Sequence, residues 1–218
     1  MRPNEYNQTN KQVITGILKK QGYVIAEPWH DKVLDISFQF FSLGNGEVEY
    51  RGQTSFSTDI SGHYTGNYLQ EYPADLSSEL KAFLSENLPE VRSVLHKALL
   101  ASPYSTDYYG WLGIDLLIFG CEKGKFRIHP CLEINCRFTM GAITLSLRDH
   151  LARGSTGIFR IMQAEKGYFD QFCGQMTKKE PLIIDSGKIV KGFLALTPIL
   201  PDCSSGAWIS VKNERMIE

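Results

Sequence analysis

The sequence has no long apolar run, and this absence sets the first limits on what the protein can be. No stretch approaches the roughly 20 apolar residues that a membrane-spanning helix requires. The opening residues, Met-Arg-Pro-Asn-Glu-Tyr-Asn-Gln, lack the apolar core of a signal peptide. The formal net charge is only −1, so no global electrostatic attraction to nucleic acid or to an anionic membrane is expected. We therefore expect neither a nucleic-acid nor a membrane partner.

Cysteine is scarce and forms no recognisable motif. There are five cysteines, an odd number, and no Cys-x-x-Cys occurs. Both facts argue against a disulfide framework and against a zinc site. A reducing cytoplasm is the simplest setting for such a chain, so we expect a cytoplasmic localisation.

Internal repeats, low-complexity tracts and obvious linkers are also lacking. What remains is the composition of an ordinary globular protein, with 43% hydrophobic and 22% charged residues. The 218 residues are enough for one large domain or two small ones with a real core. Composition therefore leaves the function open, and only local patterns of residues point to one.

The stretch from 109 to 138 has the pattern of a β-hairpin. Apolar residues of high β-propensity run from 111 to 119, a polar turn follows at 122–125, and a second strand is predicted over 126–137. Gly124 can adopt the positive φ that such a turn requires. The hairpin thus places two strands that carry polar side chains next to each other.

The register of this hairpin predicts that two carboxylates face each other. If the turn is centred near Gly124, Asp115 lies opposite Glu133, with Cβ atoms roughly 4.5–5.5 Å apart. Pro130 cannot donate to the ladder and favours a bulge, which leaves the register open by a residue or two. Facing like charges are destabilising, and a hard divalent cation with oxygen ligands would offset that repulsion.

The second strand strengthens this interpretation. Glu133, Asn135 and Arg137 follow a period of two and therefore share one face. Carboxylate and amide oxygens suit Mg²⁺, and a guanidinium suits phosphate. The pattern predicts a Mg-nucleotide site on a rigid sheet. The alternative is that these are polar residues on the solvated face of an antiparallel sheet.

Two motifs of the hairpin, Gly113-Ile-Asp115 and Leu132-Glu-Ile-Asn-Cys-Arg-Phe138, resemble the metal-binding end of the ATP-grasp carboxylate–amine ligases. The resemblance implies that the two acids and the amide hold Mg²⁺ or Mn²⁺ bridging the ATP phosphates. It also implies that the arginine faces the phosphates or an acyl-phosphate. Many members carry an arginine at the position of Gly113, so one phosphate or substrate contact is missing here. The implied metal ligands are Asp115, Glu133 and Asn135, and the implied catalytic residue is Arg137.

The stretch from 27 to 35 carries the second part of the resemblance. A short strand is predicted over 23–27, followed by a turn and another strand. In ATP-grasp proteins a similar stretch links two subdomains and lines the adenosine pocket. By resemblance Glu27 contacts the adenine amino group, Asp35 the ribose hydroxyls, and the backbone near Trp29 and His30 the edge of the adenine ring. An ordinary loop with an aromatic plug is the alternative.

The stretch from 57 to 68 is rich in Gly, Ser and Tyr, which predicts a loop of the kind that carries function. In ligases of this family the equivalent region approaches the acceptor substrate or the γ-phosphate. His63 and Tyr64 are the weaker candidates for a substrate contact. The alternative for the histidine is a solvent-exposed side chain without a role.

The whole pattern predicts an α+β fold, with a mostly antiparallel sheet flanked by helices, like the C-terminal subdomain of the ATP-grasp fold. Amphipathic spacing marks the helices, and short β-rich runs mark the strands. Helices are predicted over 9–20, from 76 to a break at 87–89, over 89–101 and over 141–151, and strands over 33–41, 47–54, 158–163, 182–185, 189–197 and 208–211.

The resemblance covers roughly residues 9 to 150 and only the second half of an ATP-grasp enzyme. The resemblance implies a single domain over 1–218 with three parts: 1–29, a remnant of the first subdomain with the hinge; 30–154, the second subdomain with the metal site; and 155–218, a C-terminal extension of unknown role. The lysine and the Gly-rich loop of the first subdomain cannot be placed in the sequence. A missing N-terminal half, supplied in cis or in trans, is therefore expected.

The implied function is the Mg-ATP-binding part of a ligase that activates an unknown small-molecule carboxylate as an acyl-phosphate for attack by an amine. Without its N-terminal half, this chain alone is expected to be inactive, because phosphate clamps contribute strongly to catalysis. Two alternatives stay open. One is a non-catalytic nucleotide- or metal-binding remnant, and the other is a structural domain whose hairpin acids are solvated.

Overall fold

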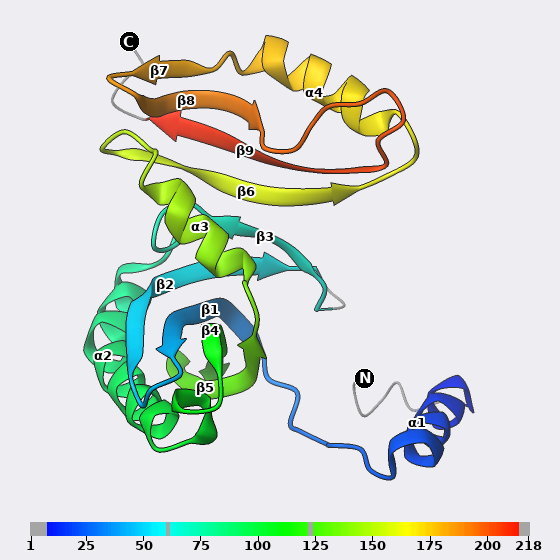
Figure 1. Ribbon diagram of the computed structural model, residues 1–218, viewed down its shortest axis with the longest axis vertical. Coiled ribbons are helices and arrows are strands. Elements are labelled where there is room, and N and C mark those ends of the chain that lie inside the picture. The colour runs from blue at the N-terminus through cyan, green and yellow to red at the C-terminus, as the bar shows by residue number, and fades with distance from the viewer. Residues whose placement is uncertain (1–7, 60–61, 122–123, 214–218) are drawn as a thin grey trace. The chain divides into compact units, whose positions relative to one another are not determined.

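The computed structural model of the protein describes residues 8–59, 62–121 and 124–213. Its internal contacts divide the chain into two units, 1–31 and 32–218. In the first unit α1 (Gln8–Gln21) forms over the predicted helix, and residues 22–31 are neither helix nor strand (Figure 1). The strand predicted over 23–27 is therefore wrong, because β-rich residues form a strand only where another strand pairs with them.

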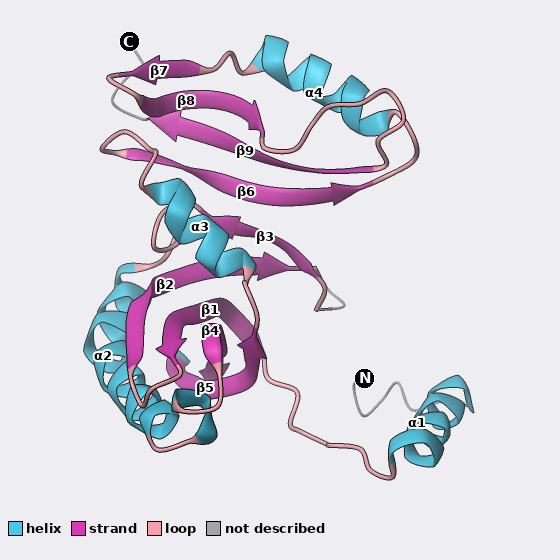
Figure 2. Ribbon diagram, in the orientation of Figure 1, coloured by secondary structure: helices cyan, strands magenta, loops and turns pink. Residues whose placement is uncertain are grey.

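The second unit is built on one antiparallel sheet (Figure 2). Among the described residues nine strands join it, in the order β5-β4-β1-β2-β3-β6-β9-β8-β7. The predicted α+β class with a mostly antiparallel sheet is confirmed. The strands are β1 (Lys32–Leu43), β2 (Val48–Thr58), β3 (Tyr64–Tyr68), β4 (Tyr109–Cys121), β5 (Lys125–Cys136), β6 (Ser155–Gln163), β7 (Ile183–Asp185), β8 (Lys188–Ala195) and β9 (Ser205–Asn213).

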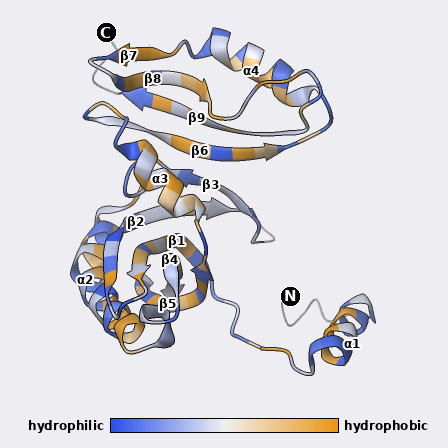
Figure 3. Ribbon diagram, in the orientation of Figure 1, coloured by the Kyte–Doolittle hydropathy of each residue, from blue (hydrophilic) through white to orange (hydrophobic). Residues whose placement is uncertain are grey.

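One face of β1 and β4 is the main core. Residues of even number from 34 to 42 in β1 and from 112 to 118 in β4 are buried, and Figure 3 shows hydrophobic and hydrophilic residues alternating along this part of the sheet. The long helix α2 (Ser78–Leu100) covers that face through its leucines. The core side chains of the two strands are Leu34, Ile36, Phe38, Phe40, Leu112, Ile114, Leu116 and Ile118.

Helix α2 corrects two predictions. It begins after Ser77, whose hydroxyl accepts a hydrogen bond from Leu80 N, and not at the predicted residue 76. It also runs through Pro89 as one helix instead of two. Proline removes one helical hydrogen bond, but buried leucines on both sides of it, Leu88 and Leu99, keep the two halves on the same core.

The segment after residue 154 continues the same sheet. β6 pairs with both β3 and β9, and β8 pairs with β9. A helix that the sequence pattern did not predict, α4 (Tyr168–Lys179), covers this part with Phe169 and Cys173, which pack with Phe193 and Trp208 in a separate cluster. None of the described helices combines the length and hydropathy that a membrane-spanning helix requires.

Helix α3 (Met140–Arg148) packs against β1, β2, β3 and β4. Thr139 caps its N-terminus by accepting a hydrogen bond from Ala142 N. Arg148, at its end, donates to the carbonyl oxygens of Gln53, Leu69 and Gln70, each at 2.7 Å. These bonds fix the C-terminal end of the helix to β2 and to the segment that follows β3. A short 3₁₀ helix, η2 (Pro103–Ser105), precedes β4.

Candidate functional site

Three neighbouring strands place the predicted carboxylates in one row. β4 pairs with β5 so that Asp115 lies opposite Glu133, which confirms the predicted pairing. On the other side β4 pairs with β1 so that Asp115 lies opposite Ser37. This row lies on the face of the sheet opposite to the main core, since Ile114 and Leu116 point into the core.

The predicted irregularity in β5 is also present. Leu117 pairs with His129 and Asp115 with Glu133, so β5 has two more residues than β4 between these pairs. Pro130 lies in this segment, as expected for a residue that cannot donate to the ladder. Nearer the turn Cys121 pairs with Lys125, two residues short of the predicted register. The two extra residues of the bulge compensate for this difference. The pairing predicted from a turn centred at Gly124 is therefore correct only from Asp115 and Glu133 onward, away from the turn.

Asn135 connects the two carboxylates. Its Nδ2 donates to Glu133 Oε1 at 2.7 Å and to Asp115 Oδ2 at 3.1 Å. Arg137 in turn donates from Nη2 to Asn135 Oδ1 at 3.0 Å. The four residues that the sequence predicted for the metal and phosphate end therefore form one connected polar group, and the amide nitrogen lies where it reduces the repulsion between the acids.

The electrostatics of this group favour a cation. Burial raises the pKa of Asp115 to about 6; a hydrogen bond with Ser37 opposes this rise, and the negative charges of Glu133 and Asp35 add to it. The pKa of Asp35 is also raised by burial, with Lys32 acting in the opposite direction. Acids that are costly to ionise together gain from a positive charge between them.

The donor set fits Mg²⁺ with one adjustment. Within the described residues no three His, Cys, Asp or Glu side chains come together around a common metal position. The protein would supply two carboxylates and one amide oxygen, which is typical of Mg²⁺ sites completed by phosphates and water. Asn135 presents its nitrogen to the acids, so its amide must turn over for its oxygen to become a ligand.

A buried chain of hydrogen bonds supports the row from the side, on the same face of the sheet. Thr139 Oγ1 donates to Gln39 Oε1 at 2.6 Å, and Gln39 Nε2 donates to Ser37 Oγ at 2.7 Å. Ser37 then interacts with Asp115. The chain therefore runs from the N-terminus of α3 to the candidate metal ligand. The sequence analysis did not single out these three residues, although Ser37 and Gln39 follow Asp35 with a period of two.

Gly113 explains why no arginine stands two residues before Asp115. A Cβ atom at this glycine would lie 2.8 Å from Thr139 Cγ2 and 3.5 Å from Gln39 Oε1. A separation below 3.0 Å requires a buried neighbour to move, and Thr139 is held in place as the cap of α3. The same packing that orients Ser37 therefore disfavours a side chain at position 113.

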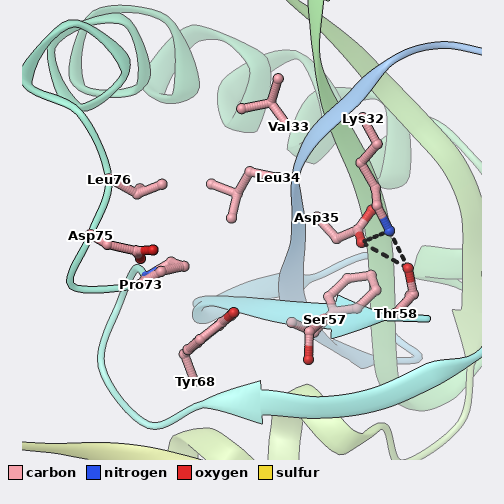
Figure 4. Close-up of a pocket in the computed structure, with 11 residues that line it drawn as sticks. Lys32, Val33, Leu34, Asp35, Ser57, Thr58, Tyr68, Pro73, Asp75 and Leu76 are labelled. Atoms are coloured by element: carbon pink, nitrogen blue, oxygen red, sulfur yellow. Dashed lines mark hydrogen bonds and ion pairs between the residues drawn. The ribbon is translucent and has the colours of Figure 1, made fainter. Parts of the chain in front are cut away.

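Asp35 lies beside a cavity of about 250 Å³ at the start of β1 (Figure 4). Its carboxylate is buried and accepts a hydrogen bond from Lys32 Nζ at 2.8 Å, and Lys32 also contacts Thr58. Tyr68, Pro73, Asp75 and Leu76 are among the other residues that line the cavity. Lys32 was not among the predicted residues, because a spacing of three on a regular strand places two side chains on opposite faces. The register of β1 shifts between Lys32 and Leu34, which the sequence pattern did not predict.

The remaining predicted residues come from two other stretches of the chain. Glu27, Trp29 and His30 belong to the unit that ends at residue 31, so their contact with adenine stays a prediction. The prediction that 57–68 forms one loop is wrong, because β2 extends to Thr58 and β3 begins at Tyr64.

The two candidates of this stretch are engaged with near neighbours. His63 Nδ1 lies 3.1 Å from Asp59 Oδ2, and the histidine side chain is 80% exposed. Tyr64 donates from its hydroxyl to Asn67 Oδ1 at 2.5 Å. Their role toward a substrate stays a prediction.

No protein-family model matches the sequence, and no curated protein sequence matches it. Solved structures do match. A biotin carboxylase complex with β,γ-ATP from Campylobacter jejuni aligns with 98% of this chain and 50% of its own, with a TM-score of 0.54 and 12% identity. N5-carboxyaminoimidazole synthetase from Staphylococcus aureus, complexed with ADP, aligns with 95% of this chain and 53% of its own, with a TM-score of 0.50 and 11% identity.

The likeness to these two structures concerns the fold. Both are ATP-grasp enzymes, and this chain spans about half the length of each. The predicted fold, that of the C-terminal part of an ATP-grasp protein, is thereby confirmed.

Proposed function

We propose that this chain is the Mg-ATP-binding part of an ATP-grasp-type ligase that activates a carboxylate as an acyl-phosphate for attack by an amine. The observation that carries the proposal is the pairing of Asp115 with Glu133, with Asn135 and Arg137 joined to them by hydrogen bonds, in a fold like that of biotin carboxylase. The likeness of fold alone would not assign a function.

In this proposal Asp115, Glu133 and Asn135 hold Mg²⁺ or Mn²⁺. When bound, the ion neutralises phosphate charge and fixes the phosphates for in-line transfer. Because ligands must be deprotonated, the raised pKa of Asp115 makes binding weaken as the pH falls below about 6. Arg137 is exposed and uses one donor for Asn135, which leaves other N–H groups to bind phosphate oxygens.

The nucleotide would extend along the strands from this polar group. Asp35 precedes Ser37 by two residues on the same face of β1, roughly 7 Å along the strand from the carboxylate row. This spacing supports a ribose contact at Asp35, and Glu27, Trp29 and His30 would complete the adenine end. His63 and Tyr64 would approach the γ-phosphate or the substrate.

The partners follow from the chemistry. The reaction requires ATP, a small-molecule carboxylate and an amine, and it takes place in the cytoplasm. The chain spans about half the length of the matched structures, so an N-terminal half in cis or in trans would supply the remaining phosphate contacts. The same half-length supports the second candidate, a nucleotide- or metal-binding remnant without turnover.

Thermal unfolding with Mg²⁺ alone, ATP alone and both together tests the proposal. A ligand at 100 times its dissociation constant stabilises by about 2.7 kcal/mol, which raises the midpoint by several degrees. We expect this rise only with both components, and its loss in the double variant Asp115→Asn/Glu133→Gln. The exposed pair Asp202→Asn/Glu165→Gln carries the same change of charge and is the matched control.

Two results would contradict the proposal in different ways. If the double variant keeps the rise, the nucleotide binds elsewhere. If the unchanged chain shows no rise, it does not bind nucleotide without its missing half, and binding activity by this part alone is refuted.

A further inference from the structure

An aromatic cluster lies at one end of the strands that carry the candidate site. It consists of Phe41, Tyr109, Trp111 and Phe138. The ring centroids of Phe41 lie 5.4 Å from Tyr109 and 5.6 Å from Trp111, and Trp111 lies 5.7 Å from Phe138. All three contacts are edge-to-face, so each ring leaves part of its face or edge without an aromatic neighbour.

The cluster is open to solvent instead of forming part of a core. Tyr109 is 72% exposed and Phe138 55% exposed, and the other two rings are half-buried. The guanidinium of Arg51 lies 5.5 Å from the centroid of Phe41. Large aromatic side chains gathered in the open are costly to hydrate, and such a patch on a folded domain marks a binding surface.

The ladder between β1 and β4 places this cluster on the same face as the carboxylates. Phe41 lies opposite Trp111, as Ser37 lies opposite Asp115, and each pair has odd numbers. Trp111 and Asp115 are four residues apart, roughly 13 Å along β4. Phe138 directly follows Arg137 in the chain. The cluster therefore begins where the polar group ends.

The order of the polar and aromatic residues along this face indicates which molecule the cluster binds. Asp35 stands at the start of β1, the carboxylate row follows, and the aromatic cluster lies beyond it. A nucleotide with its ribose at Asp35 and its phosphates at the carboxylates thus directs its terminal phosphate toward the cluster. The molecule that receives the phosphoryl group must lie beyond that phosphate.

We propose that the aromatic cluster binds the acid that is activated, and that this acid carries a planar apolar group, such as an aromatic ring, a few bonds from its carboxylate. The proposal rests on the proposed function and adds the class of substrate. The ring would stack on Trp111 and Phe138, and the carboxylate would lie toward Arg137. Arg51 forms an ion pair with Glu49, so its charge is already satisfied, and Arg137 is the better partner for the acid.

Binding of model acids to the complete chain, without nucleotide, tests this inference. The probe is 3-phenylpropanoate, and propanoate, which has the same carboxylate without the ring, is its control. Saturation-transfer NMR detects weak ligands, and we expect transfer to the ring protons of 3-phenylpropanoate and an affinity at least tenfold above that of propanoate. Equal affinities for the two acids would overturn the proposal.

Substitutions of exposed rings test whether 3-phenylpropanoate binds at the aromatic cluster. Tyr109→Ala and Phe138→Ala remove solvent-exposed rings, so we expect an unchanged unfolding midpoint and at least a threefold weaker binding of 3-phenylpropanoate. Tyr168→Ala on α4 removes a tyrosine that is 52% exposed elsewhere and is the matched control. If both cluster variants bind as the control does, the ring binds elsewhere and the proposal fails.

Three further outcomes separate this inference from its rivals. If the chain dimerises in sedimentation and Tyr109→Ala disperses the dimer, the cluster is an interface between copies and the proposal is overturned. If 3-phenylpropanoate does not bind but Mg²⁺ with ATP still raises the unfolding midpoint, the substrate class is wrong and the proposed function stands. Binding of the acid that survives Asp115→Asn/Glu133→Gln would support the cluster as a site distinct from the metal end.

Discussion

Asp115 and Glu133 lie directly opposite each other in the β4–β5 ladder, on a face where Asp35 adds a third carboxylate. Facing acids destabilise a sheet, and here one of them is half-buried. The amide of Asn135 donates to both members of the pair. Without a cation the protein therefore carries a local electrostatic cost that a bound cation would relieve, and this cost can be measured.

The first prediction concerns pH. The pKa of Asp115 is raised to about 6 in the folded protein, above its ordinary value of 3.8, so the folded state binds the proton more tightly than the unfolded state does. Stability contributed by this group is therefore highest below about pH 4 and falls as the pH rises to about 6. The loss amounts to roughly 2–3 kcal/mol.

Asp115→Asn should remove this dependence. Thermal unfolding in the absence of divalent cations should show the variant more stable than the wild type at pH 7.5, with the difference shrinking toward pH 4. Other titrating groups cancel in the comparison. If the variant is less stable than the wild type at pH 7.5, or if the difference in stability is the same at both pH values, the charge of Asp115 does not destabilise the folded protein.

The second prediction concerns Asn135. Asn135→Asp replaces the amide that bridges the two acids with a further carboxylate. We expect a lower unfolding midpoint without divalent cation and a larger rise on adding Mg²⁺ than in the wild type, because the new oxygens are better ligands. Asn45→Asp, in the exposed β1–β2 turn, adds the same charge and should show neither effect.

The third prediction concerns the contact between Gly113 and Thr139. Gly113→Ala places a methyl group 2.8 Å from Thr139 Cγ2 and should cost about 1–3 kcal/mol through overpacking. Thr139→Ser removes that methyl group and keeps the hydroxyl that caps α3 and bonds Gln39. In a double-mutant cycle by urea unfolding, the two changes together should cost less than their sum. If the two free-energy costs simply add, the methyl group at position 113 does not clash with the methyl group of Thr139.

The fourth prediction concerns Arg148, which is largely buried and bonds the carbonyl oxygens of Gln53, Leu69 and Gln70. Arg148→Met leaves these acceptors without their donor and should lower the free energy of unfolding by at least about 3 kcal/mol. Arg153→Met, at an exposed position near the end of α3, is the control and should change it by less than about 0.5 kcal/mol. A loss below about 1 kcal/mol for Arg148→Met would show that water replaces the guanidinium.

Local patterns in the sequence were sufficient to predict the centre of the candidate site. A turn glycine and a period of two placed Asp115 opposite Glu133 and put Asn135 and Arg137 on the same face, because pairing across a hairpin depends on residues that are close in sequence. Next to the turn the predicted register is two residues off, and the bulge at Pro130 restores the predicted pair. The same logic predicted α1, α3 and most strands of the second unit. It missed α4, and it divided α2 at Pro89 where leucine packing on both sides continues the helix.

Only the tertiary structure decided what surrounds that centre. Thr139 and Gln39 are 100 positions apart in sequence, yet they form part of the chain of hydrogen bonds beside Asp115. The aromatic cluster likewise gathers rings from β1, β4 and the segment before α3. Contacts of this kind depend on how distant strands are ordered in a sheet, which no local period encodes. The sequence by itself therefore determined the pair of acids and its neighbours, whereas the packing of the sheet determined their pKa, their support and the apolar surface beside them.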